Sequence, residues 1–160
     1  MQNTTLIYLV RDGKALMLLK NGGLNEGKWV GIGGHMEENE SPWDCVKREV
    51  MEETGLTLRS ADFRGVVTFV SDTWEGEQMF LFTSEDFEGN TGICDEGELR
   101  WTPLEEIGSL RLWEGDKIFL RLLAEGKSGI LLKLSYRGDD LVSAVLDDTE
   151  LVGEDGIWKM

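Results

Sequence analysis

Residues 34–56 of the chain read GHMEENESPWDCVKREVMEETGL, and they carry the clearest local structural signals in the sequence. Ser41 is a favourable helix N-cap, and Pro42 suits the first helical position because an N–H there would have no partner within the helix. Gly55 is the residue type that most often ends a helix in a left-handed conformation. The stretch therefore predicts a loop followed by a helix from about Pro42 to about Thr54.

Three glutamates of this helix lie on neighbouring points of one surface, because Glu49, Glu52 and Glu53 are spaced i, i+3 and i+4. Like charges at this spacing destabilise a helix by about 0.2–0.5 kcal/mol per pair. Hard divalent cations prefer carboxylate oxygens, so a bound cation would use the same arrangement as a ligand set. The triplet alone leaves two interpretations open, a cation site and a solvated acidic face.

The residues around the triplet follow a longer pattern, G-x5-E-x7-R-E-U-x-E-E-x-G-U, in which U is a bulky aliphatic residue. Every fixed position is met, by Gly34, Glu40, Arg48, Glu49, Val50, Glu52, Glu53, Gly55 and Leu56. This pattern resembles the signature of the Nudix hydrolases, the MutT-like pyrophosphohydrolases. The signature covers residues 34–56 only, but the wider order of strands agrees with the family over roughly positions 4 to 125.

The resemblance implies an α+β fold, the Nudix α/β/α sandwich with a mixed β-sheet between helices. We expect one domain over residues 1–160, with a hairpin at about 129–148 as an added element. Strands are expected over Thr4–Arg11, Ala15–Leu19, Lys28–Met36, Leu58–Ser71, Gln78–Thr83, Glu98–Thr102, Gly129–Tyr136 and Leu141–Leu146. A polar connection is expected at Ser84–Gly97, and Asp116 is expected to cap a second helix that ends near Ala124.

The resemblance also implies a metal cofactor, Mg²⁺, for which Mn²⁺ can substitute. Glu49, Glu52 and Glu53 would hold it, and a backbone carbonyl near Gly34 would complete its shell. Arg48 would keep the glutamates in place. Glu52 or Glu53 is the first choice for the group that activates water, and Glu49 is a further candidate.

A further acidic ligand is expected from outside the helix, at Glu96, with Glu98 as the nearby alternative. His35 occupies a variable position of the signature and is expected to be an exposed loop residue. Cys45 lies near the carboxylates, where we expect a small packing residue and not a nucleophile, because no base partner is evident.

Substrate choice is expected to depend on residues outside the signature. The segments GKWVGIGG (27–34), DEGELRW (95–101) and LWEGD (112–116) resemble the 8-oxo-dGTP diphosphatases of the MutT and human-homologue type. In that comparison Trp113 stacks on the purine and Asp116 bonds to its edge, although Trp113 would equally suit an ordinary core position. The remaining pocket positions by resemblance are Leu24, Val30 and Phe69.

Two positions depart from that pattern and affect base recognition. The human-type enzymes carry asparagine where Val30 stands and a second aspartate where Gly115 stands. Neither valine nor glycine has a side chain that can hydrogen-bond a base. We therefore expect fewer polar contacts to the purine and weaker discrimination between bases.

The amino-acid composition narrows the classes of molecule that we expect this protein to bind. The 160 residues include 16 basic and 31 acidic ones, for a net charge of −15, which disfavours binding to nucleic acid polymers and to anionic membranes. A small nucleotide could still bind with cations. Two cysteines, Cys45 and Cys94, are too few for a disulfide framework and favour a reducing, cytoplasmic location. We expect a monomer or a homodimer.

The function expected from these features is metal-dependent hydrolysis of a diphosphate bond in a nucleoside triphosphate. The products would be a nucleoside monophosphate and pyrophosphate, and the substrate could be 8-oxo-dGTP. One alternative is hydrolysis of another nucleoside diphosphate derivative, such as ADP-ribose or a nucleotide sugar. A Nudix-fold nucleotide sensor without activity is another, and the intact Arg48 and glutamate set argues against it.

Overall fold

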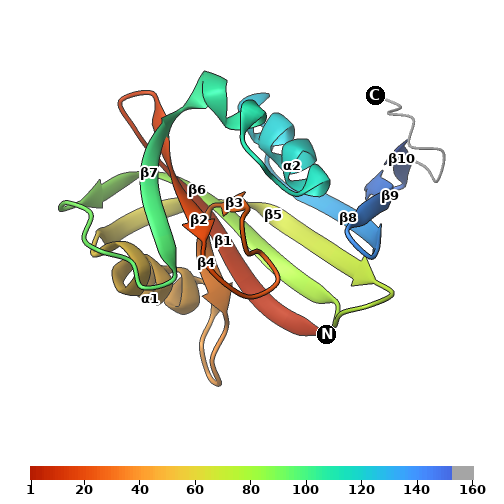
Figure 1. The fold of residues 1–160 in the computed structure, drawn as a ribbon, viewed down its shortest axis with the longest axis horizontal. Coiled ribbons are helices and arrows are strands. Elements are labelled where there is room, and N and C mark those ends of the chain that lie inside the picture. The colour runs from red at the N-terminus through yellow and green to blue at the C-terminus, as the bar shows by residue number, and fades with distance from the viewer. Residues whose placement is uncertain (153–160) are drawn as a thin grey trace. The chain divides into compact units, whose positions relative to one another are not determined.

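The computed structural model describes residues 1–152, which form ten strands, two α-helices and one 3-10 helix (Figure 1). The chain divides into two units. The first contains Met1–Thr4, Phe63–Leu81 and the chain from Trp113, and the second contains Thr5–Asp62 and Phe82–Leu112. Strands β1 (Gln2–Arg11), β5 (Thr57–Ser71) and β6 (Glu77–Glu88) have residues in both units. The expectation of a single domain stays a prediction.

In the second unit, β1 and β2 (Lys14–Lys20) form the hairpin that Asp12-Gly13 predicts. Asp12 and Gly13 both have positive φ, 54° and 73°, as the twist of a two-residue hairpin requires. Strand β2 pairs antiparallel with β3 (Trp29–Val30) and with β7 (Gly97–Pro103). The short strand β4 (Ile32–His35) pairs with β1, and the 3-10 helix η1 (Leu104–Ser109) follows β7.

Helix α1 spans Pro42–Thr54, the range that its capping residues predict. The Ser41 side chain accepts a hydrogen bond from the Asp44 N–H, and Gly55 ends the helix at φ 80°. The helix packs beside β4, burying Cys45, Val46, Val50 and Thr54. The sequence also predicts an apolar stripe of Trp43, Val46 and Val50 on this helix, which is wrong at Trp43, because that residue is 36% exposed and lies outside the buried arc.

In the first unit, β5 pairs parallel with β8 (Ile130–Arg137), from Gly65 opposite Ile130 to Ser71 opposite Tyr136. Strand β9 (Asp140–Leu146) pairs antiparallel with β8, and β10 (Thr149–Val152) pairs antiparallel with β9. Parallel and antiparallel pairs together make the sheet mixed, as predicted. Helix α2 (Glu114–Ala124) packs against β9.

Four details differ from the expected elements. The single strand expected over Lys28–Met36 is divided into β3 and β4. Helix α2 begins at Glu114 and its N-cap is Trp113, which makes no capping side-chain bond, so the prediction of Asp116 as the cap is wrong. Strand β6 continues to Glu88, through residues predicted to be a polar connection. Strand β10 was not predicted. Trp158, for which the sequence leaves docking on the domain and docking on a partner equally open, lies outside the described residues.

No helix within residues 1–152 is both long and apolar enough to cross a membrane.

Candidate active site

Arg48 is the centre of the candidate site, which lies entirely in the second unit. Its guanidinium donates two hydrogen bonds to the Glu40 carboxylate, from Nε to Oε2 at 2.7 Å and from Nη2 to Oε1 at 2.9 Å. Nη1 contacts Glu49 Oε1 at 2.8 Å and Glu52 Oε2 at 3.1 Å. Nη2 also donates to the His35 carbonyl at 3.1 Å, so one side chain connects α1 to both ends of the loop that precedes it.

These contacts with Arg48 change the pKa of Glu40. The bonds from Arg48, followed by the bond from the Glu37 N–H, lower the pKa of Glu40 to about 2. Glu40 therefore stays ionised under all ordinary conditions and holds the loop on Arg48. The predicted role of Arg48 in orienting the glutamates requires such contacts, and that role stays a prediction.

Glu53 is the most deeply buried carboxyl of the set, with 5% of its surface exposed. Its Oε2 accepts a hydrogen bond from the Gly33 N–H at 3.2 Å. Burial raises its pKa to about 9, helped by a hydrogen bond to Glu96 and by the negative charges of Glu49 and Glu96. The pKa of Glu96 is lowered by the same bond, so Glu53 holds the proton and Glu96 accepts it.

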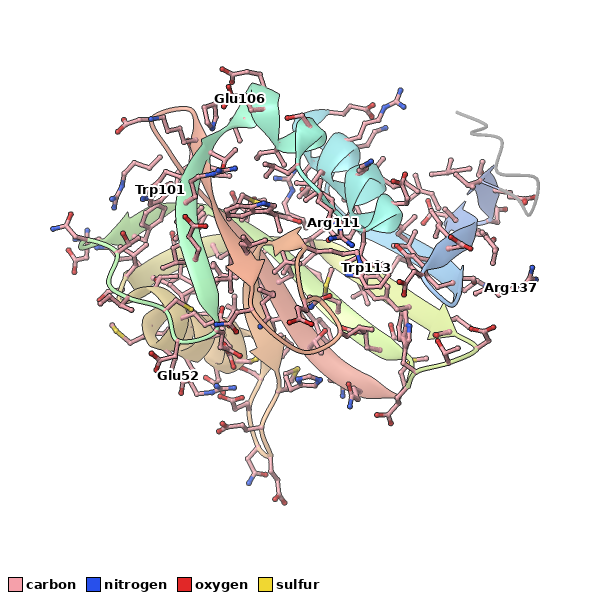
Figure 2. The ribbon with its side chains drawn as sticks, viewed as in Figure 1. Glu52, Trp101, Glu106, Arg111, Trp113 and Arg137 are labelled. Carbon is pink, nitrogen blue, oxygen red and sulfur yellow. The ribbon has the colours of Figure 1, made fainter. Side chains whose placement is uncertain are left out.

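Glu49 lies between Arg48 and the backbone of Gly34. A Cβ added to Gly34 would lie 2.7 Å from Glu49 Oε1, so glycine at this position leaves room for the carboxylate. Burial raises the pKa of Glu49, whereas the bond from Arg48 opposes that rise. Glu52 is different, because 58% of its side chain is exposed, and Figure 2 shows it on the outer side of α1.

Cys45 packs behind this set and is completely buried. Its Sγ lies 3.3 Å from Thr5 Oγ1 and donates to the Gly34 carbonyl at 3.7 Å. Burial raises the pKa of the thiol, which opposes formation of a nucleophilic thiolate. The prediction of a packing residue is confirmed, and His35 is exposed as predicted.

The donor set suits a hard divalent cation by its chemistry. Four carboxylates and a backbone carbonyl supply only oxygen ligands, and the two largely buried carboxylates, Glu49 and Glu53, require a cation or protons to offset their charges. The side chains are not preassembled, because no three acidic, histidine or cysteine groups within residues 1–152 are arranged to hold an ion. Ion pairs to Arg48 instead engage Glu49 and Glu52.

Two contributors were missed by the sequence reasoning. Lys20 Nζ lies 3.4 Å from Glu96 Oε1 and brings a positive charge to the acidic pair. Gly33 supplies the N–H that orients Glu53 and packs so closely on β1 that an added Cβ would lie 1.9 Å from the Thr5 carbonyl oxygen. Lys20 and Glu53 both contact Glu96, and this favours Glu96 over Glu98 as the additional acidic ligand.

The residues expected to bind the base are divided between the two units. Leu24 and Val30 belong to the second, where Leu24 is 51% exposed. Val30 is opposite Leu18 in the ladder and therefore shares a sheet face with Lys20, two residues further along β2. The other three belong to the first unit and are at most 9% exposed: Phe69, Trp113 and Asp116.

Asp116 and Trp113 are both buried, Asp116 as an acid and Trp113 among other aromatic rings. Burial, assisted by the charge of Glu77, raises the pKa of Asp116 to about 8. Trp113 makes edge-on contacts with Trp74, at 6.5 Å between ring centroids, and with Tyr136, at 5.4 Å. Its role in stacking stays a prediction.

Comparisons with known proteins agree with this geometry. The family model described as "NUDIX domain" matches residues 1–123. The chain is 29% identical to an oxidized purine nucleoside triphosphate hydrolase of Danio rerio, over 91% of this chain and 94% of the relative. It is 33% identical to an uncharacterized Nudix hydrolase of Bacillus subtilis, over 92% and 95% of the two chains.

A solved MutT protein from Bacillus halodurans superposes with a TM-score of 0.84 at 29% identity, covering 93% of this chain and 99% of that one. The α+β fold with its mixed sheet is thus the fold of the MutT proteins. With the signature, the carboxylates around Arg48 and the match over residues 1–123 in agreement, the chain belongs to the Nudix family of hydrolases.

Proposed function

We propose that the protein hydrolyses a diphosphate bond of a nucleoside triphosphate and releases a nucleoside monophosphate and pyrophosphate. The observation that carries this proposal is the set of carboxylates in the second unit, each contacted by Arg48, Gly33 or Lys20. Diphosphate hydrolysis needs such a set, because the phosphate charge must be spread while a water molecule is activated.

The residues that would hold Mg²⁺, or Mn²⁺ in its place, are Glu49, Glu52, Glu53, Glu96 and the carbonyl of Gly34. The bound cation would neutralise phosphate charge and increase the acidity of a bound water molecule. Arg48 is a positioning residue, since its ion pairs fix the carboxylates.

Glu53 is well suited to accept the proton of the attacking water, with Glu52 as the alternative. A carboxyl acts as a base near neutral pH most effectively when its pKa is raised toward the working pH. Burial raises the pKa of Glu53 to about 9, past neutrality, so Glu53 would act as a base only after a bound cation had displaced its proton, for which Glu96 offers a second carboxylate.

We propose an oxidised purine nucleotide, such as 8-oxo-dGTP, as the preferred substrate. Support comes from the relative in Danio rerio, whose name gives oxidized purine nucleoside triphosphates as its substrates, and from the aromatic and acidic residues at the start of α2. Trp113 and Asp116, with Phe69, Leu24 and Val30, are the proposed base-binding residues. The free state of both cysteines supports a reducing compartment such as the cytoplasm.

The test measures pyrophosphate release from 8-oxo-dGTP, dGTP and dATP, and in parallel it measures cleavage of ADP-ribose in phosphate-free buffer. These assays test both the proposed reaction and the proposed base preference. We expect activity with Mg²⁺ that EDTA removes, and a higher kcat/KM for 8-oxo-dGTP than for dGTP. Equal kcat/KM values for the two would overturn the oxidised-base preference. Cleavage of ADP-ribose alone would overturn the triphosphate assignment, and binding without turnover would point to a sensor.

A further inference from the structure

The start of α2 is shaped around the hydroxyl group of Tyr136. A Cβ added to Gly115 would lie 2.6 Å from the Tyr136 hydroxyl oxygen and 2.6 Å from Leu134 Cδ1. The Gly115 N–H donates to that hydroxyl oxygen at 2.8 Å. Tyr136 reaches this point from β8, and both residues belong to the first unit. The hydroxyl therefore occupies the space that any side chain at position 115 would need.

The bond from Gly115 uses the hydroxyl oxygen as an acceptor and leaves its proton available. Within residues 1–152 no acceptor receives that proton, although the side chain is 4% exposed. Burial, together with the nearby charge of Asp116, raises the pKa of Tyr136, so the group remains protonated and remains a donor.

A second donor without a partner lies in the same aromatic cluster, which consists of Trp74, Trp113 and Tyr136. The indole Nε1 of Trp74 is buried and makes no hydrogen bond to any described residue. Its ring lies 5.9 Å from that of Tyr136 and 6.5 Å from that of Trp113, which Figure 2 shows at the start of α2. Leaving a buried donor unpaired costs free energy, so two in one cluster indicate a ligand that supplies acceptors.

We propose that the Tyr136 O–H and the Trp74 N–H are specificity-determining donors that bind the acceptor edge of an oxopurine base. This inference rests on the proposed function and specifies its base. Guanine-type bases present carbonyl oxygen and ring nitrogen acceptors, whereas adenine presents an amino donor at the corresponding position. Two donors beside an aromatic surface therefore favour oxopurines.

The test removes each donor while keeping an aromatic ring at the position; Tyr136→Phe preserves the ring itself, whereas Trp74→Phe also shortens the aromatic system. Tyr136→Phe and Trp74→Phe should each raise KM for 8-oxo-dGTP and dGTP by about fivefold to tenfold, the usual effect of one hydrogen bond, with kcat unchanged. KM for dATP should stay the same. Tyr8→Phe, which removes a phenol hydroxyl in the second unit, and Trp43→Phe on the exposed side of α1 are matched controls and should leave all KM values unchanged.

A structural role is separated from recognition by stability and by NMR. Tyr136→Phe also deprives the Gly115 N–H of its acceptor, so a lower melting temperature is expected in either case. If the melting temperature falls while the KM ratio of 8-oxo-dGTP to dATP stays at the wild-type value in both variants, the proposal is overturned.

The six tryptophans give six indole N–H signals with ¹⁵N labelling, and the signal that Trp74→Phe removes is that of Trp74. Titration with the free nucleoside 8-oxo-deoxyguanosine should move this signal and leave that of Trp43 in place. Because the nucleoside has no phosphate, this result is independent of whether triphosphates are hydrolysed. A stationary Trp74 signal at saturating nucleoside would contradict the inference, and absent turnover with a moving signal would contradict only the proposed function.

Discussion

Replacing Glu53 with glutamine should separate the catalytic demand on this carboxyl from its effect on stability. Glutamine has the same shape as a protonated glutamate, so its carbonyl can accept from Gly33 and its amide can donate to Glu96. The variant therefore keeps both bonds at every pH but can neither carry a negative charge nor accept a proton. We expect kcat to fall by at least about 100-fold, the lower range for losing a general base.

The same change should stabilise the protein at pH 7.5 in the absence of metal. The pKa of Glu53 rises from 4.5 to about 9 on folding. A raised pKa gives a stability contribution that is complete below the unfolded value and is lost as pH rises through the folded value. Between pH 4.5 and pH 7.5 the loss for wild type is at most about 4 kcal/mol, at about 1.4 kcal/mol per unit. Glu53→Gln should lack that loss.

Urea unfolding in EDTA at pH 5 and pH 7.5, with turnover measured in Mg²⁺, tests both expectations. The unfolding free energy of wild type should decrease between the two pH values by more than that of the variant. Glu98→Gln, an equal charge change at an exposed position of β7, should behave like wild type in both assays. Turnover above about a tenth of wild type in Glu53→Gln would refute its assignment as base and ligand, and a variant less stable than wild type at pH 7.5 would refute the electrostatic reasoning.

Three further changes test other parts of the structure. Arg48→Lys keeps the positive charge but loses the planar guanidinium, so the free energy of unfolding in urea should fall by about 1–3 kcal/mol. An unchanged unfolding midpoint would contradict the proposed role of the Arg48 ion pairs. Gly34→Ala would place a methyl group against Glu49, so the Mg²⁺ concentration for half-maximal activity should rise about tenfold or more, unlike in Gly22→Ala, where an added Cβ meets nothing. The pKa of Asp116 is raised to about 8, so the free energy of unfolding should fall as pH rises from about 4 to about 8, by up to about 1.4 kcal/mol per pH unit. Asp116→Asn should flatten the plot of unfolding free energy, measured in urea, against pH over this range.

Local signals predicted helix α1 to the residue, whereas they misplaced the start of α2. Ser41 and Gly55 determine the ends of α1 through bonds to their own neighbours, so the sequence contains all the required information. Helix α2 begins without a capping side chain, at a point where Tyr136 on β8 accepts the N–H of Gly115. A partner 21 residues away substitutes for a cap there, and no local pattern reports it.

The unpredicted end of β6 has a similar cause. Its last residues are polar, which suggests a loop, but they pair with polar residues at the start of β5. Ser84 donates to the Ser60 carbonyl, Ser60 bonds to Asp86 at 2.6 Å, and Arg59 forms an ion pair with Glu88. Cross-strand pairs of this kind stabilise a strand that has little apolar character.

The family signature identified the carboxylates but not the groups that tune them. Glu53 was recognised by its spacing. Its pKa, however, depends on burial and on contacts with Gly33 and Glu96, which come from two other segments of the chain. Lys20 had no recognisable pattern, and its role emerges only from its 3.4 Å approach to Glu96.

The charge balance of the site explains why an acidic protein suits a polyanionic substrate. Two cations, Arg48 and Lys20, contact a group of six glutamates linked by ion pairs or hydrogen bonds, namely Glu37, Glu40, Glu49, Glu52, Glu53 and Glu96. Six acids against two bases leave a charge of −4, or −3 with the proton on Glu53. A nucleotide would add further negative charge, so it can bind only with cations that cancel both. A polymer of phosphates would meet the net charge of −15 of the whole chain, whereas a small nucleotide with its cations meets only this site.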